Sequence, residues 1–263
     1  MNKRAPLLTS LLTLAFCTLG HAAGPKTPSW QLSASAGPYK PHLSSNADQR
    51  AHFDRYYGDA DQYTFEEGPM LQSLETTWYV WNQSGLLGLS ARMGLWAISG
   101  PAQRCLGDAE DAPGTYAPCT PANAHTGVPG TTETQLKVLP LSVGVVYRAN
   151  QLHQQLGIPL EAYVKGGVDY YVWWSTVGGE LASTAAGDDG TGGTSGYHLG
   201  AGINFNLDWL DPQTSRGHDY GTSLAGSYLF FEINEIIATS FGETGRMDMS
   251  ATHYSVGISI DFR

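Results

Sequence analysis

The sequence predicts an all-β fold, namely a single eight-stranded antiparallel transmembrane β-barrel with long extracellular loops. Apolar residues alternate with polar or small ones in eight separate segments of about ten residues, as in barrel strands. Charged residues make up only 14% of the 263 residues, whereas glycines number 32 and aromatic residues reach 11%. The connections between the segments alternate between long and short, as they do in outer-membrane barrels.

The alternation defines the expected strands in chain order. It is clearest in the fifth segment, where Leu160, Ala162 and Val164 share one face and Glu161 and Lys165 lie on the other. The chain ends on the same pattern in the stretch ATHYSVGISIDFR. The expected strands lie near 29–38, 71–82, 86–99, 133–148, 159–174, 197–208, 225–235 and 251–263.

The connections place both termini at the same end of the barrel. Short turns are expected at 82–85, 149–158 and 209–224. Long polar loops are expected near 39–69, 100–132, 175–196 and 236–248. An outer-membrane barrel has short periplasmic turns and long extracellular loops, so this order predicts periplasmic termini.

The alternation does not say which face points inward, and a secreted soluble barrel with an apolar interior is the alternative. Charged residues favour the membrane barrel, because they fall in the middle of the polar face and none was identified on the apolar face. The expected lumen charge network consists of Glu75, Arg92, Glu161, Lys165, Asp169 and Glu232. Aromatic residues near the strand ends are expected to form interfacial girdles: Trp30, Trp78, Trp81, Trp96, Trp173, Trp174 and Phe262.

The N-terminus predicts export. Lys3 and Arg4 precede an apolar run from Leu7 to Leu19, followed by small residues suited to cleavage. The run is too short for a transmembrane helix, which needs about 20 residues. Residues 1–23 are therefore expected to be a cleaved signal peptide and 24–263 the barrel domain. A lipoprotein signal ending at Cys17 is disfavoured by the bulky residue before that cysteine.

Two cysteines remain after export. Cys105 and Cys119 lie in one long polar loop and are expected to form a disulfide that closes part of it. A metal site is the weaker interpretation, because no histidine or further cysteine lies at ligand spacing. The chain has 14 Lys and Arg against 24 Asp and Glu, so it lacks the basic composition of a nucleic-acid-binding protein.

Four stretches match a known family in order and spacing. They are GPYKP after the first strand, LPLSVGVVYR followed by IPLEAYVKGGVDYYVWW, and GSYLFFE before the last hairpin. Together they resemble a family of small outer-membrane β-barrel proteins known chiefly from myxobacteria, over most of residues 30–262. The resemblance implies an outer-membrane barrel and supplies no established activity or catalytic residues. Outer-membrane barrels usually end on the aromatic residue itself, whereas Arg263 follows Phe262 here.

The inward residues suggest two kinds of chemistry in the lumen. The inward charges are expected to pair with one another in a filled interior, and a gated, very narrow ion path is the alternative. His253 and Ser255 share one strand face and look like the dyad of lipid A deacylase barrels. In those enzymes the dyad faces lipid, whereas the alternation turns these two residues inward.

The expected role is structural or interactive, through the extracellular loops. The expected partners are outer-membrane lipid, the barrel-assembly machinery during insertion and an extracellular ligand bound by the loops. No cofactor, metal or nucleic acid is expected. The loop acids do not have calcium-loop spacing, and are expected to be solvated: Asp48, Asp54, Asp59, Asp61, Asp108, Glu110, Asp111, Asp188 and Asp189.

Overall fold

The computed structural model describes residues 28–43, 69–106, 116–117, 128–150, 157–182, 190–210, 224–242 and 247–263. Only the backbone is described at residues 101–106, 116–117 and 128–132. Eight long strands account for most of these residues. They are β1 (Trp30–Pro38), β2 (Met70–Trp81), β3 (Leu86–Leu106), β5 (Val128–Ala149), β6 (Leu160–Val177), β8 (Thr191–Asn206), β9 (Leu224–Ile237) and β10 (Ala251–Phe262). Short elements are β4 (Tyr116–Ala117), β7 (Glu180–Leu181) and the 3₁₀ turns η3 (Leu207–Trp209) and η4 (Ser240–Gly242).

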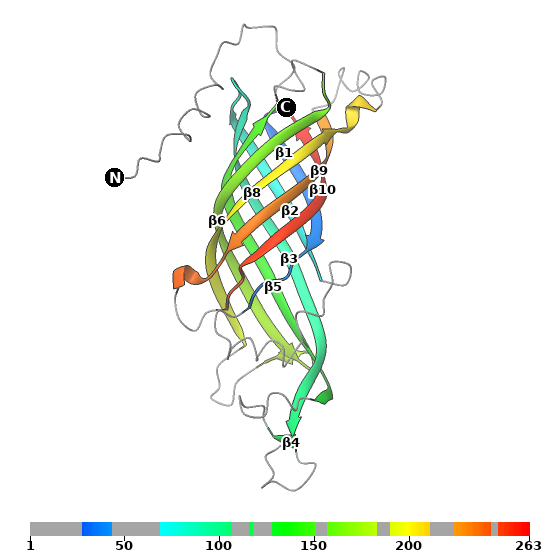
Figure 1. Ribbon diagram of the computed structural model, residues 1–263, viewed down its shortest axis with the longest axis vertical. Coiled ribbons are helices and arrows are strands. Elements are labelled where there is room, and N and C mark those ends of the chain that lie inside the picture. The colour runs from blue at the N-terminus through cyan, green and yellow to red at the C-terminus, as the bar shows by residue number, and fades with distance from the viewer. Residues whose placement is uncertain are drawn as a thin grey trace, which may run out of the picture.

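The eight long strands form a closed antiparallel barrel, which confirms the predicted fold (Figure 1). Each strand pairs with the next long strand in the sequence, from β1 to β10. The first and last strands then pair along Trp30–Ala36, so the sheet has no open side. Within the described residues, no helix is long and apolar enough to cross a membrane.

The strands are staggered by ten residues around the barrel. A row of paired residues that starts at Thr252 of β10 passes through Glu235 of β9 and on around the wall to Trp30 of β1. Trp30 pairs with Phe262, so the row returns to β10 ten residues beyond its start. This stagger tilts the strands, and it decides which lumen residues lie at the same depth.

Some strands extend well beyond the barrel on the side of the long connections. β3 continues to Leu106, β5 begins at Val128 and β8 begins at Thr191, all within stretches expected from sequence to be loops. Figure 1 shows β3 and β5 running past the other strands toward β4. Backbone pairing continues there without the apolar alternation that marks the barrel strands, which is why the sequence pattern missed it.

The two faces of the wall have opposite polarity. Outward side chains are apolar and exposed; Leu199 is 65% exposed and Val143 58%. Inward side chains include charged residues that are almost fully buried; Glu161 is 2% exposed and Asp169 4%. In a water-soluble barrel the apolar face would be the buried one.

An apolar cap fills the lumen at the loop end. Its buried members come from both strands and connections: Tyr39, Leu43, Leu71, Trp96, Ile98, Leu136, Val138, Tyr171, Ile236, Ala238, Met249 and Ala251. The Tyr39 hydroxyl donates to the Met249 carbonyl at 2.6 Å, and Trp96 Nε1 donates to the Tyr39 carbonyl at 3.0 Å. Burial raises the pKa of Tyr39, which follows β1, well above its usual value, so this donor stays protonated.

A closed polar lumen as the candidate functional site

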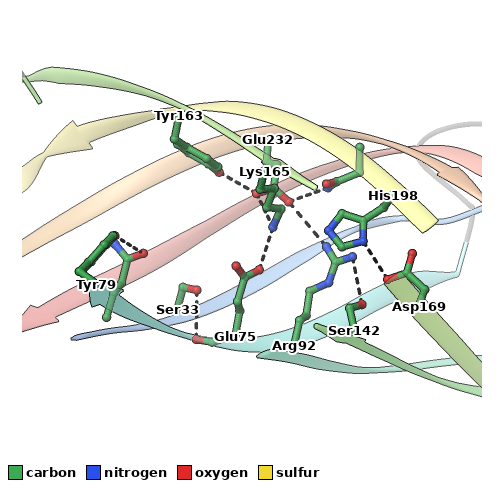
Figure 2. Close-up of polar contacts among 12 residues, drawn as sticks. Ser33, Glu75, Tyr79, Arg92, Ser142, Tyr163, Lys165, Asp169, His198 and Glu232 are labelled. Atoms are coloured by element: carbon green, nitrogen blue, oxygen red, sulfur yellow. Dashed lines mark hydrogen bonds and ion pairs between the residues drawn. The ribbon is translucent and has the colours of Figure 1, made fainter. Parts of the chain in front are cut away.

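Four charged residues form a network in the middle of the lumen. Lys165 Nζ lies 2.7 Å from Glu75 Oε2 and 2.7 Å from Glu232 Oε2, and Arg92 Nη1 lies 3.8 Å from Glu232 Oε1 (Figure 2). Glu75 and Arg92 are direct cross-strand partners on β2 and β3. Gly200 of β8 separates β6 from β9 at this level and has no side chain to block Lys165 from reaching Glu232.

Glu232 has further partners that satisfy its buried carboxylate. Tyr163 Oη donates to Glu232 Oε2 at 2.8 Å, and Asn234 Nδ2 donates to Oε1 at 2.5 Å. Arg92 Nη2 donates to Ser142 Oγ at 3.4 Å. Because a buried charge without partners is costly, the two neutral donors to Glu232 and the Ser142 acceptor for Arg92 also stabilise the network.

A second cluster lies toward the short-turn end and centres on Arg148. Its guanidinium is paired with Glu161, and Nη1 lies 2.8 Å from Asp261 Oδ2. Nη1 also donates to Tyr79 Oη at 3.3 Å, and the guanidinium carbon lies 4.2 Å from the centre of the Tyr228 ring. Arg148, on β5, therefore contacts residues on four other strands.

Asp169 belongs to neither cluster. Its Oδ1 lies 2.8 Å from His198 Nδ1, and both side chains are buried. The six charges expected to form one network therefore divide into three groups, with Glu161 and Asp169 separate from the other four. Arg148, Asp261 and His198 were not among the residues predicted for the network, although the alternation alone puts them on the inward face.

His253 and Ser255 also point into the lumen. They are 2% and 3% exposed, in agreement with the orientation expected from the alternation. The His253 ring lies against the Gly37 backbone. Neither of its ring nitrogens, nor the hydroxyl of Ser255, makes a well-formed hydrogen bond among the described residues.

The open space beside these groups is of two kinds. A hollow of about 670 Å³ is lined mainly by outward apolar side chains and borders Glu75, Arg92, Ser142 and Asp169. A cavity of about 30 Å³ lies between the central network and the Arg148 cluster, bounded in part by Ser33, Tyr79 and Lys165. That volume accommodates a water molecule or two. The apolar cap occupies the lumen beyond the network.

The exposed aromatic side chains among those predicted to form girdles lie mainly at the short-turn end. Trp78 is 66% exposed, and Trp30 stacks on Phe262 with the ring centres 4.0 Å apart. Trp81 is 39% exposed, and Trp209 of η3, which the sequence analysis did not include, is 56% exposed. Trp174 is partly buried at the loop end.

Two of the expected girdle residues face inward instead. Trp96 is only 2% exposed because it packs in the cap and donates to the Tyr39 carbonyl. Trp173 packs against the same cap. The girdle prediction was wrong for both, because it relied on nearness to a strand end and not on the face of the strand.

The outward face is not entirely free of charge. Glu235 is exposed on it, and Thr252 Oγ1 of the neighbouring strand donates to Glu235 Oε2 at 2.7 Å. This corrects the expectation of an uncharged outer face. Glu235 lies near the loop end of β9, two residues before the strand ends, so it leaves the central part of the face apolar.

The remaining predicted sites lie wholly or partly outside the described residues. Backbone atoms of Cys105 pair with Ala117, but Cys119 lies outside the described residues and the disulfide stays a prediction. The loop acids and residues 1–23 also lie outside them. The described residues contain no group of three or more His, Cys, Asp or Glu able to hold a metal ion.

No family model matches the sequence, and no curated protein matches it significantly. Solved outer-membrane barrels are similar in fold at low identity. The N-terminal β-barrel domain of Pseudomonas aeruginosa OprF is 9% identical, with a TM-score of 0.39 over 89% of this chain and 98% of that one. Neisserial surface protein A is 11% identical, with a TM-score of 0.40 over 89% and 97%. A major outer membrane protein from Thermus thermophilus is 13% identical, with a TM-score of 0.36 over 89% and 98%. Likenesses at this level carry no information about activity.

Proposed function

We propose that this chain spans a Gram-negative outer membrane and has a structural or surface-interaction role, exerted through its loop-side end. The inverted polarity of the wall is the observation that carries the proposal. Large apolar side chains such as Leu199, Val143 and Val168 are more than half exposed, while charged residues fill the interior. Monomeric soluble proteins rarely expose so large an apolar surface, whereas a lipid bilayer requires one.

The two ends of the barrel support an orientation. The short turn at 82–85 and the chain end at Arg263 lie at one end, and the extended parts of β3, β5 and β6 lie at the other. In outer-membrane barrels the short turns are periplasmic and the long connections extracellular. The extended strands then form a raised surface outside the cell, available to an extracellular ligand.

The filled lumen favours a non-conducting, non-enzymatic protein. Ion pairs occupy its centre and the apolar cap occupies its loop end. The partners are then bilayer lipid on the outward face and the assembly machinery during insertion, with export directed by the signal peptide predicted at 1–23.

Fractionation combined with gel mobility tests the proposal. The protein is expected in the outer-membrane fraction, beginning near residue 24, and it should migrate differently before and after boiling, as folded barrels do. Recovery as a soluble periplasmic protein with no change on boiling would contradict the membrane placement.

A narrow pore is the second candidate, favoured by the charged lining of the lumen. Conduction would require Lys165 to leave Glu75 or Glu232 and the cap to move aside. In planar bilayers we expect the purified protein to remain silent at all voltages. Stable single-channel steps that change in a Lys165→Met variant would support the pore instead.

A lipid-modifying enzyme is less well supported, because His253 and Ser255 lie on the lumen side of β10. A lipid ester in the bilayer faces the other side of that strand. Expression of the chain is expected to leave the mass of lipid A unchanged. Loss of an acyl chain that disappears in a Ser255→Ala variant would support the enzyme.

A further inference from the structure

One layer of the lumen contains five buried polar atoms that make no well-formed hydrogen bond among the described residues, although the His253 ring also lies against the Gly37 backbone. They are Asp169 Oδ2, Asn234 Oδ1, both ring nitrogens of His253 and Ser255 Oγ. All four side chains are at most 4% exposed. A sixth such atom, Trp173 Nε1, belongs to a side chain that packs against the cap.

The layer lies between the apolar cap and the central charge network. The His253 ring is edge-on to the Tyr39 ring of the cap, with centres 6.0 Å apart. On the other side, Asn234 donates to Glu232 of the network. His253 and Asn234 are direct cross-strand partners, and Ser255 follows on the same face of β10, so four of the five atoms come from neighbouring positions.

The orientation of these groups is determined by their other contacts. Asn234 Nδ2 donates to the Glu232 carboxylate, which leaves Oδ1 as a free acceptor; a flipped amide would put two oxygens together. Asp169 uses Oδ1 for His198 and leaves Oδ2 as an acceptor. A neutral imidazole offers one donor and one acceptor, and a hydroxyl offers both. Whatever occupies the layer must therefore both donate and accept hydrogen bonds.

This requirement identifies the ligand class. A metal ion does not fit, since the described residues contain no group of three or more His, Cys, Asp or Glu able to hold one. Small molecules that can both donate and accept do fit. Buried polar groups are almost always hydrogen-bonded, and ordered water is the usual partner when protein groups are out of reach.

We propose that this layer is a binding site for water, with His253 as its principal protein ligand. At roughly three hydrogen bonds per buried water, five atoms require about two molecules. The site would let His253 exchange protons with bound water inside a lumen that the cap and the ion pairs close to larger solutes. It depends on the lumen contacts alone and not on placement in a membrane.

Nuclear magnetic resonance of the folded protein with ¹⁵N-labelled histidine, in detergent micelles, tests the site. Magnetisation transfer from water to the ring N–H of His253 is expected, with the signal assigned by its loss in His253→Phe. Absence of that transfer, with the ring protected from exchange, would overturn the proposal.

Two buried serines of β10 provide a matched comparison. Ser255 has no protein partner, whereas Ser259 Oγ accepts from Gln31 Nε2 at 3.2 Å. Ser255→Ala is expected to weaken the transfer from water to His253, and Ser259→Ala to leave it unchanged. Equal effects of the two substitutions, or none from Ser255→Ala, would count against the site. Folding of each variant is checked by its gel mobility before boiling.

A high-resolution crystal structure adds a second measurement, in which ordered water is expected within about 3.2 Å of a His253 ring nitrogen.

Discussion

Arg148 connects more strands than any other residue considered in the lumen. Its partners are Glu161 on β6, Asp261 on β10, Tyr79 on β2 and Tyr228 on β9. A guanidinium suits this position because it is planar and has five N–H donors directed in different ways. Arg148 therefore links several strands through its side chain at the short-turn end of the lumen.

Replacing Arg148 by Met should destabilise the barrel by about 3–5 kcal/mol, because Glu161 and Asp261 would be left as buried, uncompensated carboxylates. Urea unfolding in phospholipid vesicles measures the change. As a control, Arg148→Met combined with Glu161→Gln and Asp261→Asn should recover part of the loss. A triple variant no more stable than the single one would show that the carboxylates are not the cause.

The two glutamates bound to Lys165 should differ in importance. Glu232 also contacts Arg92, Tyr163 and Asn234, and its side chain is 5% exposed, compared with 14% for Glu75. Glu232→Gln should cost about 2–3 kcal/mol and Glu75→Gln about 1 kcal/mol, by the same unfolding measurement. The reverse order would mean that Lys165 binds mainly Glu75.

Trp96 shows what residue-level prediction can miss. The alternation puts it on the same face as Arg92, which is inward, but its position near a predicted strand end suggested an interfacial role. The partners that make it a cap residue, Tyr39 and Met249, are distant in the sequence. Nothing in the local pattern identifies them.

At the level of strands, sequence periodicity predicts the segments but not their stagger. The alternation repeats every two residues, so any even shift between neighbouring strands keeps the polar face inward. The observed stagger of ten residues is what puts Lys165, and not Glu161 or Asp169 of the same strand, at the depth of the central network. Pairings such as Arg148 with Asp261, which join β5 to β10, could not be predicted without it.

Close packing between strands predicts a large effect at Gly202. A methyl group there would meet the Tyr163 ring and lie 2.6 Å from the Phe231 carbonyl oxygen. Gly202→Ala should therefore move Tyr163 away from Glu232 and cost about 1–3 kcal/mol in urea unfolding.

Gly166 is the matched control for that substitution. A methyl group there would meet only the end of the Leu199 side chain at 3.0 Å and a carbonyl at 3.4 Å. Gly166→Ala should change stability by no more than about 0.5 kcal/mol. Similar losses at both glycines would point to a general intolerance of side chains in the strands, and not to the contact with Tyr163.

The connection after β3 leads to a prediction about covalent structure. Cys105 and Cys119 should be joined in the mature, exported protein. Alkylation of the unfolded protein should add mass at both cysteines only after reduction, as measured by intact mass spectrometry. Alkylation of both cysteines without reductant would exclude the disulfide.

For the molecule as a whole, the best-predicted property is its inverted polarity. Alternation and the mid-strand charges indicated that polar residues fill the interior, and the exposed fractions agree, with Glu235 as a charged exception on the outside. The height of the extended strands was not predicted, because backbone pairing requires no particular side chains.

Inverted polarity predicts a depth-dependent cost of charge. Val143→Arg, in the middle of the apolar face, should destabilise the barrel by about 2–4 kcal/mol in vesicles, whereas Ser99→Arg, beyond the cap on β3, should cost roughly 0–1 kcal/mol. Both residues are exposed, so in a soluble protein both changes would be small. Equal, small effects at both positions would argue that the outward face meets water.

The pairing of β1 with β10 determines when the wall can be completed. β1 comes first in the sequence among the eight long strands, yet one of its two neighbours is the last of them. Until β10 pairs with β1, β1 and the last strand to have joined the sheet each present unpaired N–H and C=O groups. Such groups readily pair with other chains. β1 is thus enclosed only when β10 is in place, and every partly folded barrel that lacks β10 has two exposed strand edges.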